Sequence, residues 1–445
     1  MTPVATTAAR RPLGVRLLPE VWHYGWWIAL GIAVVMFATV GVGFYGLAVF
    51  LAPLQDENGW SNAAVSGATG LYFSLSGLTG FLVGPLVDRR GPLRPMAIGI
   101  TLVGLSAMAL ARVDELWQLY LVYSVQAVAF GLAGQVATNA IIARWFVTKR
   151  AKAISISATG VSLGGVVLAP LGTWLIGRGG VSLAALVMGV LVIVIALPIV
   201  ATVLVWDPAQ VDLEVDGGAA NPGVANASLA DEVQQRVWTR TEAARTVAFW
   251  AVLAAFLLGL AAQTGFLLHQ IAFLTERFGS ANRAAFALSI TAFGSIVARI
   301  ALGQVADRLD KRVLTAGLFG LQGAAILGLL AIDGIAVTYA LVMVVGFTIG
   351  NVYMMQTLLV GELFGMVSLA TVFGVIGLAV QVGSGLGPLL VGLIEDRTGS
   401  YDAAFAVSAC VLFAAAVTVL AARAPAAAEA TEEARSGHPA SEAGR

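Results

Sequence analysis

The residue with the strongest chemical signal is Arg299, which lies inside a long apolar stretch, eight positions before Asp307. In a helix this places it roughly 12 Å from the charged end of the stretch. Arg299 is the only lysine or arginine well inside such a stretch, and the nearest acidic residues, Glu276 and Glu362, stand at stretch ends. A buried cation is costly unless it is solvated or paired, so Arg299 is expected to face a central cavity.

An unpaired guanidinium in this position predicts an anion-binding site. Its planar fork of N–H donors suits a carboxylate. The alternative is a structural arginine that bonds backbone carbonyls, bridges helices or extends toward the end of its helix. The residues alone leave both interpretations open.

His269 is the only side chain inside the apolar stretches that titrates near physiological pH. It is therefore the candidate for carrying a coupling proton, although the proton could travel with the substrate or coupling could be absent. The chain has three histidines, of which only His269 lies in an apolar stretch, and one cysteine, Cys410. We therefore expect no metal cluster and no internal disulfide.

The composition predicts that membrane-spanning helices position these residues. Of the 445 residues, 59% are hydrophobic and 11% charged, against about 25% charged in soluble domains. Apolar runs of about 20 residues recur, which indicates a polytopic membrane protein. The net charge of zero gives no support for nucleic-acid binding. The predicted spans are 24–52, 62–86, 93–112, 117–143, 151–176, 182–205, 247–275, 284–308, 313–332, 336–360, 369–394 and 402–422.

These spans divide the chain into five expected segments. They are a cytoplasmic N-terminal tail (1–23), an N-terminal six-helix half (24–205), a cytoplasmic linker (206–246), a C-terminal six-helix half (247–422) and a disordered cytoplasmic C-terminal tail (423–445). The linker is polar, and a short amphipathic helix is expected in it around Leu229–Arg245. The tail is rich in alanine, glutamate and serine, which is typical of disorder.

The basic residues predict the orientation in the membrane. With the N-terminus inside, only five of them fall in external loops: Arg112, Arg178, Arg277, Arg283 and Arg397. All three lysines fall on the inner side. Both termini are therefore expected in the cytoplasm, with the protein in the plasma or inner membrane.

A charged loop occurs twice, 219 residues apart, as GPLVDRRG (84–91) and GQVADRLDKR (303–312). Each copy separates two apolar runs, so the two halves carry the same loop at the same place. An Asp and an Arg there can pair with a neighbouring helix end and hold a gate shut. The alternative is that the basic residues only fix topology and the Asp caps a helix. The candidate gating residues are Asp88, Arg89, Arg90, Asp307 and Arg308.

Both loops resemble the signature G-x-x-x-D-R/K-x-G-R/K of the major facilitator superfamily, with Asp310 in place of glycine in the second copy. The resemblance covers nearly the whole chain. It implies an all-α membrane protein of twelve transmembrane helices in two pseudo-symmetric six-helix halves. It also implies a monomeric secondary transporter that works by alternating access without a cofactor. The sequence has no Gly-rich nucleotide-binding loop, and no catalytic set of residues can be assembled within the spans. We therefore do not expect an enzyme.

Further segments resemble the monocarboxylate transporter and oxalate:formate antiporter group. The alternative is that they are basic loops, small-residue helix contacts and tight turns general to the superfamily. They are ARWF (143–146) with KRAKA (149–153), Gly160, Gly164 and Gly165, ELFG (362–365), GLGP (385–388) and DRTGSY (396–401). Members of that group have an arginine in span 8 that engages the substrate carboxylate, and Arg299 is the matching position. This sequence departs from that group at two places. Ser295 stands where many animal members have Asp, and the span that contains Gln381 has no lysine or arginine where the antiporter has a second cation. One cation balances one carboxylate, so we expect a monocarboxylate carried by symport or antiport.

In this superfamily spans 1, 4, 7 and 10 usually line the cavity. The candidate substrate contacts beside Arg299 are therefore Tyr45, Asn139, His269 and Tyr353, together with Gln381. For each, the alternative is an ordinary interhelical hydrogen bond. The rival functions are an exporter of drugs or other metabolites in which Arg299 is structural, and a membrane sensor that transports nothing.

Overall fold

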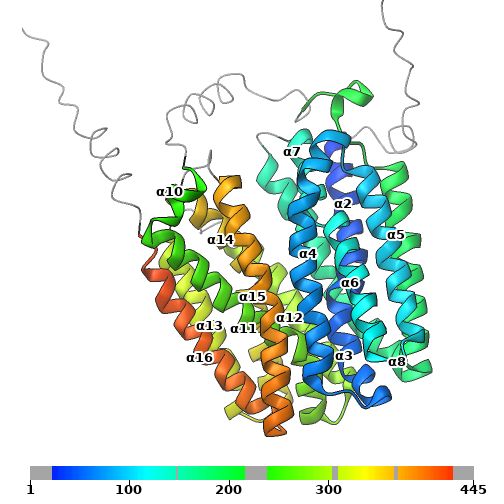
Figure 1. The fold of residues 1–445 in the computed structure, drawn as a ribbon, viewed down its shortest axis with the longest axis vertical. Coiled ribbons are helices and arrows are strands. Elements are labelled where there is room, and N and C mark those ends of the chain that lie inside the picture. Colours follow the sequence, from blue (N-terminus) through cyan, green and yellow to red (C-terminus); the bar gives the residue numbers. More distant parts are fainter. Residues whose placement is uncertain (1–22, 147–148, 216–237, 303–308, 365–368, 424–445) are drawn as a thin grey trace, which may run out of the picture.

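The computed structural model describes residues 23–146, 149–215, 238–302, 309–364 and 369–423, which form helices and short connections with no strand among them. Two bundles of helices stand beside each other (Figure 1). This agrees with the all-α, two-half architecture predicted from the sequence.

The described residues of the N-terminal half form seven α-helices, with two pairs among them that each continue along a single span. They are α2 (Tyr24–Gly43), α3 (Tyr45–Asn58), α4 (Asn62–Arg90), α5 (Leu93–Ala109) with the 3-10 turn η1 (Leu110–Arg112), α6 (Leu116–Ala133), α7 (Gln135–Trp145) and α8 (Arg150–Thr202). The first predicted span is broken at Phe44, between α2 and α3, and the fourth at Gly134, between α6 and α7.

The described residues of the C-terminal half form six long helices, and none of these is broken in the same way. After η2 (Pro208–Val211) and α10 (Arg240–Ala244) come α11 (Val247–Phe278), α12 (Ala281–Leu302), α13 (Lys311–Ala331), α14 (Ile335–Phe364), α15 (Leu369–Thr398) and α16 (Tyr401–Leu420). Of the amphipathic helix expected around Leu229–Arg245, the described residues show only the five of α10. Residues 216–237, which hold the rest of it, and most of both tails lie outside the described residues.

Ten candidate spans are found among the described residues, and two features of the N-terminal half bring this number to the predicted twelve. The first feature is the candidate span Lys152–Thr202, which is 51 residues long. It bends at Gly179 and Gly180, where Gly180 has φ 70°, a backbone conformation natural to glycine, and so it crosses twice. The remaining crossing is α4, whose 29 residues are long enough although serine, threonine and glycine lower its hydropathy.

The aromatic–basic connector ARWF is a structural anchor. Buried Trp145 donates its indole N–H to the Val205 carbonyl oxygen over 2.9 Å. Arg144 pairs with Asp207 over 2.8 Å and lies 4.6 Å from the centre of the Trp206 ring. The connector between α7 and α8 therefore fixes the segment that leaves the N-terminal half, which accounts for its residue types without a role in binding.

Two helix pairs, α4 with α15 and α8 with α12, make the most extensive contacts between the halves, and α3 with α11 makes a smaller one. Figure 1 shows α4 and α15 side by side between the bundles. These two pairs, called below the α4–α15 seam and the α8–α12 seam, position the candidate site.

Candidate functional site

Arg299 is mostly buried on α12, and its guanidinium bridges the two halves. Nη1 donates to the Ala158 carbonyl oxygen over 3.0 Å and to Ser162 Oγ over 2.9 Å, and both acceptors belong to α8. Nε donates to the Gly350 carbonyl oxygen of α14 over 3.2 Å. Within the described part of the chain the two N–H bonds of Nη2 have no hydrogen-bond partner, and Arg299 has no salt bridge. The guanidinium therefore keeps part of its donor fork unused.

Backbone carbonyls and a serine hydroxyl contact the guanidinium, and no carboxylate of the described residues does so. Ser162 Oγ lies 2.7 Å from Ser295 Oγ, and Ser295 donates to the Ala292 carbonyl oxygen over 2.7 Å. The chain of bonds from Arg299 through Ser162 to Ser295 carries no negative charge. The positive charge of Arg299 is thus solvated by dipoles and remains available to attract an anion.

Tyr45, the first residue of α3, lies beside this cluster. Its hydroxyl is near enough to Arg299 for the two groups to interact electrostatically. A Cβ atom on Gly165 would lie 2.5 Å from Tyr45 Cζ and 2.9 Å from the Cβ of Ala292, so only glycine leaves room for the ring there. The structure therefore brings together two of the predicted site residues, Arg299 and Tyr45.

The α4–α15 seam is closed at the end of the bundle where α4 begins. The Asp396 carboxylate accepts from the backbone N–H groups of Asn62 and Ala63, each over 2.8 Å. The Asn62 side chain donates to Glu395 Oε2 over 2.6 Å and to the Tyr401 hydroxyl over 2.7 Å. We call this end of the bundle the closed end. A carboxylate at a helix N-terminus also interacts favourably with the helix dipole.

His269 lies in the same seam, one helical turn further in. It is fully buried, and its Nε2 is 3.1 Å from Ser66 Oγ of α4 and 3.1 Å from the Pro388 carbonyl oxygen of α15. Deeper still, Gly70 faces Gly385 with their backbones in close approach, and Gly77 packs on the side chain of Gln381. His269 and Gln381 are therefore seam residues, separate from the contacts of Arg299.

The α8–α12 seam runs from the closed end to Arg299. Ser289 donates to the Val166 carbonyl oxygen over 3.0 Å, and the Ser162–Ser295 and Arg299 contacts follow further along both helices. Both seams thus hold the halves together from the closed end as far as the level of Arg299.

The remaining predicted site residues are placed as follows. Asn139 is exposed on α7, which packs against helices of its own half. Tyr353 belongs to α14, but its side chain lies outside the described structure. Asp88, Arg89 and Arg90 form the last turn of α4, where Arg90 is exposed and the other two side chains are not described. Asp307 and Arg308 lie outside the described residues.

Asp310, which replaces the signature glycine, is the N-cap of α13. Its carboxylate accepts from the backbone N–H groups of Arg312 and Val313 and pairs with the Arg312 guanidinium over 2.7 Å. The hydrogen bond from the Arg312 side chain is the main reason that the pKa of Asp310 falls to about 2. This residue therefore has a structural reason to be acidic.

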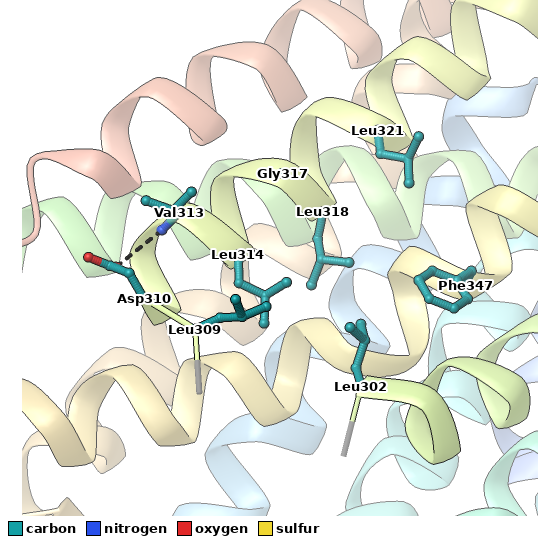
Figure 2. A pocket seen from close by; sticks show the side chains of 9 residues that line it. All are labelled: Leu302, Leu309, Asp310, Val313, Leu314, Gly317, Leu318, Leu321 and Phe347. Atoms are coloured by element: carbon teal, nitrogen blue, oxygen red, sulfur yellow. Dashed lines mark hydrogen bonds between the residues drawn. The ribbon is translucent and has the colours of Figure 1, made fainter. Parts of the chain in front are cut away.

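An apolar groove of about 440 Å³ lies beside Asp310, between the end of α12, the start of α13 and α14 (Figure 2). Its lining is Leu302, Leu309, Asp310, Val313, Leu314, Gly317, Leu318, Leu321 and Phe347. Among its described lining residues Asp310 is the only charged one, and that carboxylate already caps α13. The described lining thus offers a carboxylate none of the side-chain donors that surround Arg299.

Sequence reasoning missed Asn62, Ser66, Ser162 and, as a functional group, Asp396. The available signals were weak: a Ser-Asn pair at the start of α4 and a Glu-Asp pair at the end of α15. Such pairs are common helix ends. Only their juxtaposition across more than three hundred residues gives them a role, and that requires the fold.

The family model described as Major Facilitator Superfamily matches residues 29–388 and 270–444. The oxalate:formate antiporter of Oxalobacter formigenes is 25% identical over 398 residues, which is 87% of this chain and 89% of that protein. Monocarboxylate transporter 13 of Bos taurus is 26% identical over 336 residues, 74% of this chain and 73% of that protein.

A solved structure with the same fold is a bacterial homologue of the human lysosomal transporter Spinster, in an inward-facing and unoccupied conformation. The TM-score is 0.64 with 18% identity, covering 90% of this chain and 95% of that one. At this identity the likeness concerns the fold alone.

Proposed function

Because the chain belongs to the Major Facilitator Superfamily and is a multi-pass membrane transporter, we propose that its substrate is a small organic anion, a monocarboxylate. The observation that carries the proposal is the part-satisfied guanidinium of Arg299 at the meeting of the two halves, with no carboxylate paired to it among the described residues. Two relatives whose names state carboxylate transport span most of the chain.

The geometry of Arg299 suits one carboxylate. Two N–H bonds of Nη2 and the nearby Tyr45 hydroxyl can all donate to its oxygens. The other lysines and arginines of the described spans stand near span ends or, for Arg178, next to the bend of α8, so a second carboxylate beside Arg299 would be unneutralised. This supports a monoanion over a dianion.

Binding of the anion would act on the α8–α12 seam. The N–H groups of Nη1 now bond Ala158 and Ser162, which belong to the other half. A carboxylate that recruits these donors removes one attachment between the halves. Substrate binding and the movement of alternating access are thereby connected through one side chain.

In the predicted orientation, the closed end faces away from the cytoplasm, and we propose that this conformation is the one open inward. The exposed Asn139 on α7 then lies where a substrate enters from the cytoplasm. Asp88, Arg89, Arg90, Asp307 and Arg308 are proposed to hold the inner end shut in the opposite conformation, and Tyr353 and Gln381 to contact the substrate or its path. Coupling to a proton that binds His269 and shifts the conformational equilibrium, without being carried across by that side chain, is also part of the proposal.

The test is a thermal-shift screen of the purified full chain against small monocarboxylates and dicarboxylates. A ligand that binds only the folded state raises the melting temperature by mass action. We expect a shift with a monocarboxylate that is lost in Arg299→Ala and reduced in Arg299→Lys, which keeps the charge without the fork. Affinity should fall at least about tenfold, because a hydrogen bond to a charged group contributes roughly 1.5–3 kcal/mol.

The matched control is Arg277→Ala. Arg277 also donates to backbone carbonyls, those of Leu329 and Leu330 at the end of α13, but it lies at the closed end. Its loss should lower the melting temperature and leave the ligand-induced shift intact. An unchanged shift in Arg299→Ala would refute the site.

A second candidate function, export of an apolar metabolite, is supported by the three hydrogen bonds that Arg299 already makes. In that case an apolar compound, and no acid, should stabilise the wild-type chain and Arg299→Ala equally.

A further inference from the structure

His269 is positioned where four helices meet at the closed end. It is carried by α11, bonds Ser66 of α4 and Pro388 of α15, and its ring centre lies 5.5 Å from that of Tyr401 on α16. The side chain is fully buried. Its second nitrogen, Nδ1, has no hydrogen-bond partner within the described residues.

These contacts identify the form of the imidazole. A carbonyl oxygen can only accept, so Nε2, which faces Pro388, carries the hydrogen. Nδ1 is then a bare lone pair and the ring is neutral. Adding a proton at Nδ1 would bury a charged N–H with no acceptor among the described residues, which is strongly unfavourable.

Opening of the closed end would change this environment completely. Ser66 belongs to the N-terminal half, while His269 and Pro388 belong to the C-terminal half. Parting the α4–α15 seam breaks the bond to Ser66 and admits water to the ring. A solvated imidazole accepts a proton in the ordinary way, at about pH 6.5.

The charged groups near the imidazole ring are carboxylates at the closed end. Asp396 of α15 attracts a proton to His269, but its two oxygens, like Glu395 Oε2, are occupied by Asn62 and Ala63 in the closed seam. Glu276 of α11 interacts electrostatically with Glu395 of α15 and with Asp402 of α16, so these carboxylates form one acidic group.

We propose that His269 is a proton-binding site that is filled only while the closed end is open. Its ligand is the proton itself. Acid on that side of the membrane consequently holds the transporter open to that side, and closure requires the proton to leave. The proposal rests on the transporter function and on alternating access, but not on the identity of the substrate.

The test measures the opening of the α4–α15 seam directly, in the absence of substrate. The only cysteine is removed by Cys410→Ser, and spin labels are attached at Asp56→Cys in the N-terminal half and Asn282→Cys in the C-terminal half. Both positions are exposed near the closed end. The distance distribution is recorded by electron paramagnetic resonance on the full chain in nanodiscs at about pH 7.5 and about pH 5.5.

A proton bound only in the open form raises the ratio of open to closed molecules about tenfold between these two values. In His269→Gln, whose amide still donates to Pro388 but does not titrate, the ratio should stay constant in this range. An absent response in the parent, or the same response in His269→Gln, would overturn the proposal.

Ser66→Ala keeps the test decisive if His269→Gln fails to fold. It removes the bond across the seam and retains the imidazole, so more open molecules are expected at both pH values with the pH response preserved. A response lost in Ser66→Ala would contradict the proposal. Because no substrate is present, failure of the carboxylate assignment cannot produce either result.

Discussion

Replacing Asp396 with asparagine tests the α4–α15 seam at its outer end. The two carboxylate oxygens each accept one backbone N–H at 2.8 Å, from Asn62 and from Ala63. In Asp396→Asn one oxygen remains, and the other position becomes an N–H group that faces a second donor. The charge that interacts with the α4 dipole is lost as well.

The expected magnitude follows from these contacts. A hydrogen bond to a charged group contributes about 1.5–3 kcal/mol, and a charge at a helix N-terminus about 0.3–1 kcal/mol. Because Asp396 is exposed, the lower values apply, which gives about 2 kcal/mol. That free energy corresponds to roughly a thirtyfold increase in the ratio of open to closed molecules.

Asp396→Asn should weaken the α4–α15 seam and leave the helix α4 intact. Ser61 independently caps α4 by accepting from the Ala64 N–H over 3.2 Å, so the first turn of α4 survives the change. The assay is the spin-label distance between positions 56 and 282 at neutral pH, and Arg397→Gln is the control at the adjacent exposed residue. If Asp396→Asn leaves the distances unchanged, or if Arg397→Gln moves them equally, the carboxylate does not close this end.

Two further substitutions probe the positions of Tyr45 and Asp310. Gly165→Ala puts a Cβ 2.5 Å from Tyr45 Cζ, so the ring must leave Arg299 and anion-induced thermal shifts should weaken several-fold, whereas Gly374→Ala, with open space around its Cβ, should change nothing. The pKa of Asp310, about 2, lies below its usual value, so its carboxylate stabilises the start of α13 above about pH 4 and loses this contribution as pH falls toward 2. Asp310→Ala should therefore lower stability by about 1 kcal/mol at neutral pH and show no loss in that acid window, as measured by melting in detergent.

The sequence predicts the spans well because hydropathy and length are local properties. It also identifies Arg299, since one cation in an apolar stretch is conspicuous without any knowledge of its neighbours. What the sequence could not supply is the partner of each helix. Glycines occur in almost every span, and nothing in their spacing says that Gly70 meets Gly385 while Gly164 meets Gly41.

The depth and direction of His269 show the same limit. The sequence places it in span 7, but a helix presents its residues to several neighbours, and the choice between cavity and seam depends on how α11 is rotated. The degenerate loop at Asp310 shows the converse. The departure from the signature there has a local cause, an N-cap with its Arg312 partner.

Arg299 and His269 do not touch, but both form bonds that break when the two halves separate. Arg299 bonds Ala158 and Ser162 across the α8–α12 seam, and His269 bonds Ser66 across the α4–α15 seam. In our two proposals a carboxylate weakens the first attachment and a proton opposes the second. Two ligands that favour one conformation must strengthen each other's binding by the same factor. Anion and proton would then be coupled with no direct contact between their sites, because each changes the free energy of parting the same two halves.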